Sequence, residues 1–169
     1  MSKMSFPEEK KHIEVGGGDD WAKLKLAGVL ETLGLGPCVG VGVYSKVPKI
    51  GFLGHFIVGN TEQLNTMLQD AEKEIRYPAT AQLWVGGGSI APLEDSELSN
   101  EMILEYRATI EQALEDTFGP LEGRIKRDWL NENSCIDCSL NVRTGEIHTE
   151  ITPVIPDDND PPPEHRTLY

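Results

Sequence analysis

The sequence has few positive charges and no long apolar run, and both deficits exclude whole classes of function. Its 169 residues contain 15 Lys and Arg against 28 Asp and Glu, a formal net charge of −13. Nucleic acids and anionic membranes bind clustered cations, so neither is an expected partner. A transmembrane helix needs roughly 18 consecutive apolar residues. No segment approaches that length, and we expect no membrane insertion.

Cysteine is also scarce. The chain has three Cys, an odd number, and residues 1–11 lack the apolar core of a secretory signal. A chain of this kind is expected to keep its thiols reduced, and we predict a cytoplasmic protein rather than a disulfide scaffold.

Composition divides the chain into three parts. Residues 1–11 form a charged leader, residues 12–152 a single domain, and residues 153–169 an acidic, proline-rich tail. The length is typical of one domain that buries its own core. The tail lacks apolar periodicity, so we expect it to be extended or disordered.

Two segments have the apolar spacing of amphipathic helices. They cover residues 60–76 and 96–118, and Pro78 and Gly119-Pro120 follow them as stop signals. Strand patterns dominate the remainder of the domain, and residues 23–32 fit either a helix or a strand. The expected strands are 12–15, 38–44, 49–58, 80–85, 124–130, 134–142 and 146–152.

These elements predict an α+β fold in which helices pack on antiparallel or mixed sheets as a layered sandwich. Residues 38–44 and 49–58 are expected to form a hairpin through a turn at 45–48. The segment 38–44 alternates Val with Gly, which predicts that one face is pressed against another backbone.

Cys38 is the candidate nucleophile. It follows Gly34-Leu35-Gly36-Pro37, and a glycine-rich approach lets backbone N–H groups reach a reacting carbonyl. A thiol attacks as its thiolate, so it needs a base or a positive field that lowers its pKa. His55 is that candidate base, because the predicted hairpin makes Cys38 and His55 cross-strand neighbours. Spacing alone also fits a buried structural Cys and a structural His.

Other motifs are weaker. Gly86-Gly87-Gly88 and Gly16-Gly17-Gly18 lack the flanking residues of phosphate-binding loops, so we interpret both as turns. Cys135 and Cys138 form a lone C-x-x-C. A zinc site needs further ligands, and His148 is isolated. A redox motif needs a helix N-terminus, whereas strand residues three apart point to opposite faces. We expect no metal and no cofactor.

Two stretches resemble the CheD family, the chemoreceptor glutamine deamidases of bacterial chemotaxis. Thr32-Leu33-Gly34-Leu35-Gly36-Pro37-Cys38-Val39 is similar to that family's T-L-G-L-G-S-C-V, and Lys49-Ile50-Gly51-Phe52-Leu53-Gly54-His55 is similar to its K-x-G-G-x-x-H. Three further segments show a weaker resemblance. The opening strand of the family is similar to residues 13–16, its strand ending in Gly-Gly to residues 81–87, and its closing hairpin to residues 141–147. The resemblance covers roughly residues 12–150, and the segments follow the same order as in the family.

The resemblance implies a fold shared with the catalytic domain of cytotoxic necrotizing factor. It also implies a cysteine-dependent protein-glutamine deamidase without a cofactor. Cys38 would attack the side-chain amide, His55 would move the proton, and Thr32 would orient His55. The implied partners are a glutamine-bearing chemoreceptor and a regulatory phosphatase.

Several residues depart from the family pattern. Pro37 replaces the usual Ser and removes one backbone N–H beside the nucleophile, and Phe56-Ile57-Val58 replaces Met-Leu-Pro. These changes leave Cys38 and His55 in place, but they weaken the expectation of a chemoreceptor substrate. Three alternatives stay open. They are a CheD-like binding module that has lost turnover, an N-terminal asparagine amidohydrolase, and a small redox or metal protein that uses Cys135 and Cys138.

Overall fold

A computed structural model describes residues 11–90 and 98–154. Most of the expected leader and tail lies outside these residues. The elements are β1 (His12–Val15), β2 (Asp20–Lys25), β3 (Val29–Leu35), β4 (Val39–Lys46), β5 (Lys49–Phe56), α1 (Glu62–Glu74), η1 (Pro78–Thr80), β6 (Gln82–Gly87), α2 (Asn100–Phe118), β7 (Ile125–Trp129), β8 (Ser134–Asn141) and β9 (Ile147–Pro153).

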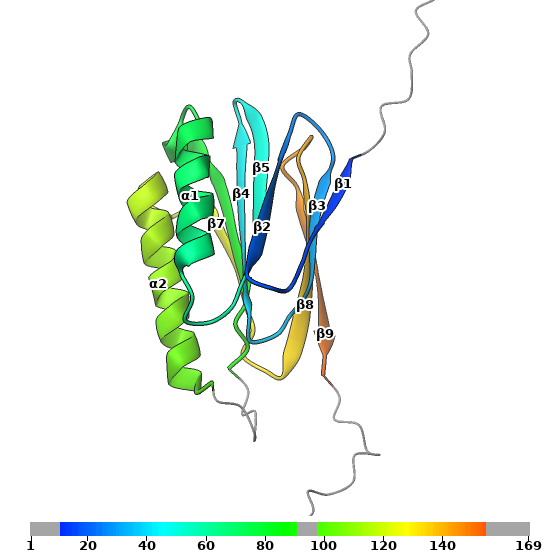
Figure 1. Cartoon of the computed structure of the whole chain (residues 1–169), viewed down its shortest axis with the longest axis vertical. Helices are drawn as coiled ribbons and strands as arrows, with labels where there is room; N and C mark the ends of the chain where they lie inside the picture. Colours follow the sequence, from blue (N-terminus) through cyan, green and yellow to red (C-terminus); the bar gives the residue numbers. More distant parts are fainter. Residues whose placement is uncertain (1–10, 91–97, 155–169) are drawn as a thin grey trace, which may run out of the picture.

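The elements form three layers, which confirms the α+β prediction (Figure 1). A five-stranded sheet has the order β2-β5-β4-β6-β7, and a four-stranded sheet has the order β1-β3-β8-β9. Both sheets are mixed, because β1 pairs with β3 and β6 with β7 in parallel, whereas the other pairings are antiparallel. Helices α1 and α2 cover one face of the larger sheet, and the smaller sheet covers its other face.

The ambiguous segment 23–32 belongs to two strands in different sheets. β2 ends at Lys25 and β3 begins at Val29, with Leu26 (φ 73°) and Gly28 (φ 129°) between them. A Cβ on Gly28 would lie 2.4 Å from the Lys11 carbonyl oxygen, so this close turn requires glycine. The break at residues 26–28 excludes the helix that the apolar spacing allows.

Other boundaries shift slightly from those expected. Helix α2 begins at Asn100, because Ser99 caps it by accepting a hydrogen bond (3.1 Å) from the Met102 N–H. Pro153, expected to begin the tail, is the last residue of β9 and pairs with Ser134. No helix in the described part of the chain is long and apolar enough to cross a membrane.

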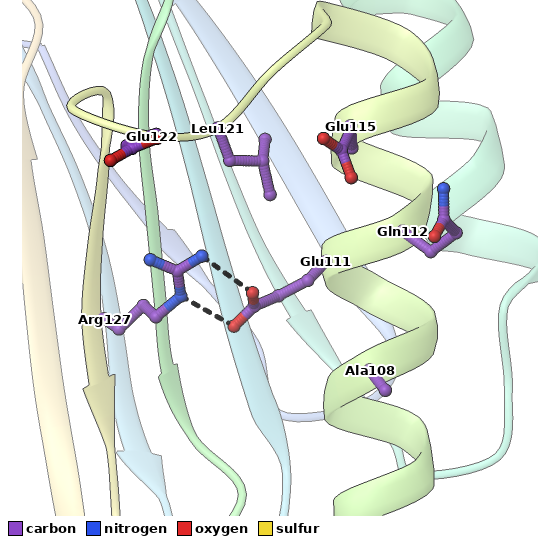
Figure 2. Close-up of a pocket in the computed structure, with 7 residues that line it drawn as sticks. All are labelled: Ala108, Glu111, Gln112, Glu115, Leu121, Glu122 and Arg127. Carbon is purple, nitrogen blue, oxygen red and sulfur yellow. Dashed lines mark hydrogen bonds and ion pairs between the residues drawn. The ribbon is translucent and has the colours of Figure 1, made fainter.

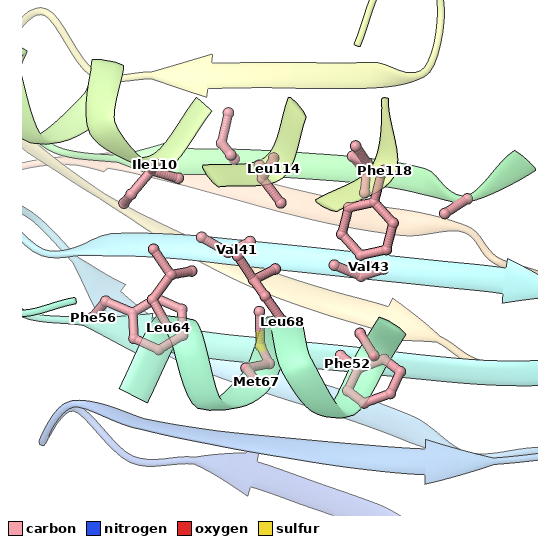
Figure 3. Close-up of a cluster of buried hydrophobic side chains, with 14 of the residues drawn as sticks. Val41, Val43, Phe52, Phe56, Leu64, Met67, Leu68, Ile110, Leu114 and Phe118 are labelled. Atoms are coloured by element: carbon pink, nitrogen blue, oxygen red, sulfur yellow. The ribbon is translucent and has the colours of Figure 1, made fainter. Parts of the chain in front are cut away.

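One core lies between the helices and the larger sheet (Figure 3). It follows the strand alternation, because every second residue of β4, β5 and β6 points toward the helices. Figure 3 labels its central side chains, which are Val41, Val43, Phe52, Phe56, Leu64, Met67, Leu68, Ile110, Leu114 and Phe118.

The second core lies between the two sheets, where the glycines of β4 are covered by side chains. A Cβ on Gly40 would lie 2.5 Å from Leu35 Cδ1 and 2.7 Å from Trp84 Cζ3. Trp84 is fully buried, and its indole Nε1–H donates a hydrogen bond (2.7 Å) to Asp128. The expected close approach of β4 to a neighbour therefore exists, but large side chains rather than another backbone fill the space.

A small side chain at residue 40 tests this packing. We expect Gly40→Ala to lower the free energy of unfolding by about 1–3 kcal/mol, since the added methyl overpacks a full core. Gly16→Ala is the matched control, because a Cβ there meets nothing within 4 Å. Urea unfolding of both variants makes the comparison, and equal stabilities would contradict this description of the sheet interface.

Candidate functional site

Cys38, His55 and Thr32 come from three segments that meet between the two sheets. Cys38 directly precedes β4, His55 lies near the end of β5, and Thr32 lies in β3. In the β4–β5 register, His55 pairs with Gly40, two residues after Cys38. Cys38 and His55 therefore share one face as diagonal neighbours, a relation that places Cα atoms about 7–8 Å apart. Thr32 and His55 are buried, and Cys38 is half-buried.

Thr32 fixes the orientation of the His55 ring. The Thr32 hydroxyl lies 2.9 Å from His55 Nδ1 and 3.3 Å from the Val15 carbonyl oxygen. A carbonyl oxygen can only accept, so the hydroxyl donates to Val15 and accepts from Nδ1–H. The imidazole then carries its proton on Nδ1, and Nε2 keeps a free lone pair. Nε2 is the nitrogen that a general base needs.

The Nε2 edge of His55 lies beside the glycine loop that joins β1 to β2. A Cβ on Gly17 would lie 3.5 Å from His55 Cε1 and 3.7 Å from Nε2. Residues 16–18 are themselves exposed. Gly17 therefore brings no side chain against this edge of the ring, a feature that the sequence pattern alone does not assign to Gly17.

Burial holds both partners in their neutral forms. Desolvation, and next the charge of Asp19, raises the pKa of the Cys38 thiol above its ordinary value. Desolvation lowers the pKa of His55, and Asp19 opposes that shift. From the sequence, we expect His55 to lower the pKa of the Cys38 thiol. The structure instead favours a thiol on Cys38 and a neutral imidazole on His55.

The glycine run 86–88 is built against Cys38. The Gly88 N–H donates to the Cys38 carbonyl (2.8 Å), and the Ser89 N–H donates to the Gly36 carbonyl (2.8 Å). A Cβ on Gly87 would lie 2.4 Å from the Cys38 carbonyl oxygen. The sequence pattern indicates a simple turn here, and the structure shows that the turn also holds the backbone of Cys38.

Arg107 on α2 holds that turn in place. Its Nε donates to the Gly88 carbonyl (3.1 Å), its guanidinium also reaches the Leu130 carbonyl, and it stacks on the Trp129 ring at 5.0 Å. Arg107 is 8% exposed. A buried arginine with backbone partners 19 and 23 residues away in sequence gives no local pattern, so sequence reasoning missed it.

A polar network beside the site was also missed. The Tyr106 hydroxyl donates to the Asn60 carbonyl, and the Asn60 side-chain amide donates to the Asp19 carboxylate. Burial, together with the charges of Asp19 and Cys38, raises the pKa of Tyr106. The network joins α2, the β5–α1 loop and the β1–β2 loop around Cys38. An acidic residue directly after three glycines was its only signal in the sequence.

The C-x-x-C cysteines do not form a pair. Cys135 is half-buried and Cys138 is buried, on opposite faces of β8, as the strand geometry predicted. Burial raises the pKa of the Cys138 thiol to about 12, which makes it unreactive. Among the described residues, no three His, Cys, Asp or Glu side chains are grouped to hold a metal ion.

A separate hollow lies between α2 and β7, away from Cys38 (Figure 2). It measures about 470 Å³, and its lining includes Glu111, Glu115, Glu122 and Arg127. The Arg127 guanidinium binds the Glu111 carboxylate through two hydrogen bonds of 2.9 and 2.8 Å. Glu111 also accepts from the Trp129 indole, so the hollow has a structural ion pair in its wall.

The fold and site thus define a two-sheet α+β protein with a Thr-His-Cys cluster between its sheets. Proteins from three organisms, each named probable chemoreceptor glutamine deamidase CheD, are similar to this chain. Those of Pyrococcus abyssi, Pyrococcus horikoshii and Moorella thermoacetica are 32%, 44% and 39% identical over 104, 48 and 83 residues. The alignments cover 52%, 28% and 49% of this chain.

These similarities confirm the resemblance to CheD that the motifs indicated. The chain spans 63%, 29% and 45% of the length of these relatives, in the same order. No protein-family model matches the chain.

Two solved structures are more distantly similar. Bacillus licheniformis hypothetical protein YfiH has a TM-score of 0.49 at 14% identity, covering 72% of this chain and 60% of its own. YlmD from Geobacillus stearothermophilus has a TM-score of 0.44 at 14% identity, covering 70% and 58%. Neither likeness is close enough to bear on function.

The neutral resting state predicts a distinctive labelling profile. We expect Cys38 to react with iodoacetamide along a pH curve whose midpoint lies above that of an exposed cysteine, because burial and Asp19 disfavour the thiolate. Mass spectrometry assigns the labelled residue. A midpoint below that of a free thiol would show that a Cys38–His55 ion pair exists in the substrate-free protein.

Arg107 gives a second prediction. We expect Arg107→Met to lower the free energy of unfolding by about 2–4 kcal/mol, because two buried carbonyls lose their donor. Arg127→Met, which removes only a partly exposed ion pair, should cost less than about 1 kcal/mol. Chemical denaturation compares the two variants, and equal losses would show that the turn does not depend on Arg107.

Proposed function

We propose that the protein is a cysteine-dependent deamidase that converts a glutamine side chain of another protein to glutamate. One observation carries the proposal. Thr32 holds His55 with Nε2 free, on the same sheet face as the half-buried Cys38. The names of the CheD relatives support glutamine as the target. The site fits this chemistry without a metal or cofactor.

The reaction begins when Cys38 Sγ attacks the carboxamide carbon and the thiol proton moves to His55 Nε2. A tetrahedral intermediate forms, and the imidazolium then gives its proton to the leaving nitrogen. The C–N bond breaks, ammonia departs, and a thioester to Cys38 remains. Water attacks the thioester with His55 as base, and the collapse of the second intermediate releases glutamate and returns the proton to Cys38.

The backbone N–H of Cys38 is the proposed donor to the oxyanion. The same N–H lowers the pKa of the Cys38 thiol and so partly offsets the effect of burial. Pro37 has no N–H, which removes the neighbouring donor that a serine there would supply. One fewer donor is expected to slow turnover, because each oxyanion donor contributes about 10²–10³-fold in rate.

The partners follow from the same resemblance. The names of the relatives make a chemoreceptor the first substrate to test. The regulatory phosphatase that the sequence resemblance implies stays a prediction. The cytoplasmic location expected from the sequence stays a prediction.

The binding-module alternative draws on a specific observation. The thiol pKa of Cys38 is raised, and a resting thiol is also what an inactive descendant would have. An N-terminal asparagine amidohydrolase would use the same Cys38 chemistry on a different amide. The three possibilities are separated by testing whether the protein converts an internal glutamine and whether replacement of Cys38 abolishes that conversion.

The decisive experiment incubates the protein with a purified chemoreceptor cytoplasmic domain. Ammonia release and peptide mass spectrometry then locate converted residues. We expect Cys38→Ser to abolish conversion and His55→Ala to lower kcat by about 10²–10⁴-fold, the range for loss of a general base. Cys135→Ser is the matched control and should retain activity.

Thr32→Val tests the orientation of the ring. It keeps the shape of the side chain but removes the acceptor of Nδ1–H. We expect roughly a fivefold lower rate, the scale set by the loss of one hydrogen bond of about 1 kcal/mol. Conversion that survives in Cys38→Ser would refute the proposal, and binding of the receptor without conversion would favour the binding module.

A further inference from the structure

Asp19 adopts a backbone conformation that needs an explanation. It has a φ of 61°, one of two non-glycine residues with positive φ in the described part of the chain. Such a conformation costs an L-residue roughly 1–2 kcal/mol, although Asp and Asn tolerate it best. Strain of this kind persists where the surrounding structure enforces it, and it is common beside functional groups.

Two neighbours hold the Asp19 carboxylate beside the Cys38–His55 pair. It accepts a hydrogen bond from the Ile57 N–H (3.4 Å) and one from the Asn60 side-chain amide. Ile57 follows His55 by two residues, and the residue before it, Phe56, pairs with Val39, which directly follows Cys38. The adjacent Asp20 pairs with His55 across β2 and β5. The Asp19 carboxylate thus lies at the end of the larger sheet where Cys38 and His55 are found.

The charge of Asp19 acts on the titratable groups at this end of the sheet interface. It raises the pKa of Cys38, of His55 and of Tyr106. Among the described residues, Cys38 interacts electrostatically with Asp19, Cys135 and Tyr106, whereas His55 interacts with Asp19 and contacts the Thr32 hydroxyl. Asp19 is the one carboxylate among them.

We propose that the negative charge of Asp19 acts on the Cys38–His55 pair in two ways. It keeps Cys38 a thiol in the free protein, and it stabilises the His55 imidazolium during attack. The first effect follows from the chain alone, and the second rests on the proposed deamidase function.

The two effects do not conflict, because the negative charge moves during the reaction. In the free protein, ionising Cys38 places a second negative charge near Asp19, which is unfavourable. In the attack step, the thiol proton moves to His55 while the negative charge passes to the substrate oxygen. Asp19 then acts on a new positive charge on His55, which its own negative charge stabilises.

Asp19→Asn tests the proposal, with Asp20→Asn as the matched control. Both changes remove one carboxylate, and asparagine tolerates the positive φ of residue 19. Asp20 is exposed, accepts a hydrogen bond from the neighbouring Trp21 N–H, and is not a group that shifts Cys38 or His55. Thermal melting confirms that both variants fold.

Three readouts separate a charge effect from a structural one. In Asp19→Asn, iodoacetamide should label Cys38 about three- to tenfold faster near neutral pH, since a lower thiol pKa gives more thiolate. The NMR titration midpoint of His55 should fall. Deamidation of the receptor should become slower. A merely structural loss would not speed labelling while it slows turnover.

Asp20→Asn should leave all three readouts near those of the wild type. The proposal is overturned if both variants change alike, or if labelling of Asp19→Asn is unchanged or slower. The labelling and titration arms need no turnover, so they decide the role of Asp19 even where the deamidase function fails. If the wild type deamidates the receptor and Asp19→Asn does so at the same rate, only the second effect is overturned.

Discussion

The site depends on the hydrogen bond between the Thr32 hydroxyl and His55 Nδ1, which joins the two sheets. Thr32 belongs to the smaller sheet and His55 to the larger one, and their 2.9 Å contact is buried. The Val15 carbonyl, on a third strand, accepts a hydrogen bond from the Thr32 hydroxyl. The hydroxyl oxygen then accepts from Nδ1–H, which leaves Nε2 as the unprotonated nitrogen of His55. Correct packing of the two sheets is therefore a condition for a usable base.

Burial gives this site a different character from that of a preformed thiolate–imidazolium pair. Desolvation penalises both charged forms, so the resting protein holds two neutral groups. Such a pair is unreactive until a substrate accepts the electrons of sulfur as the proton moves to His55. In the proposed reaction, the need for charge stabilisation therefore falls in the attack step, where we propose that Asp19 and the Cys38 N–H act.

Local patterns predict the parts of the molecule that depend on nearby residues. Alternation and turn signals are enough to place the β4–β5 hairpin, and the hairpin register puts Cys38 and His55 on one face. The same reasoning fails for residues 23–32, because the break at Leu26–Gly28 and the separation into two sheets depend on distant pairing partners. Arg107 and Asp19 escape sequence reasoning for that reason too, since their partners are far along the chain.

The central claim is that Cys38 forms a covalent bond to the substrate acyl group, and trapping that bond tests it directly. A glutamine-bearing receptor fragment is mixed with the protein, quenched rapidly in acid and digested for mass spectrometry, with hydroxylamine added in a parallel sample. We expect an acyl adduct on Cys38 that hydroxylamine converts to a substrate hydroxamate. Conversion of glutamine to glutamate with no adduct and no hydroxamate would contradict it.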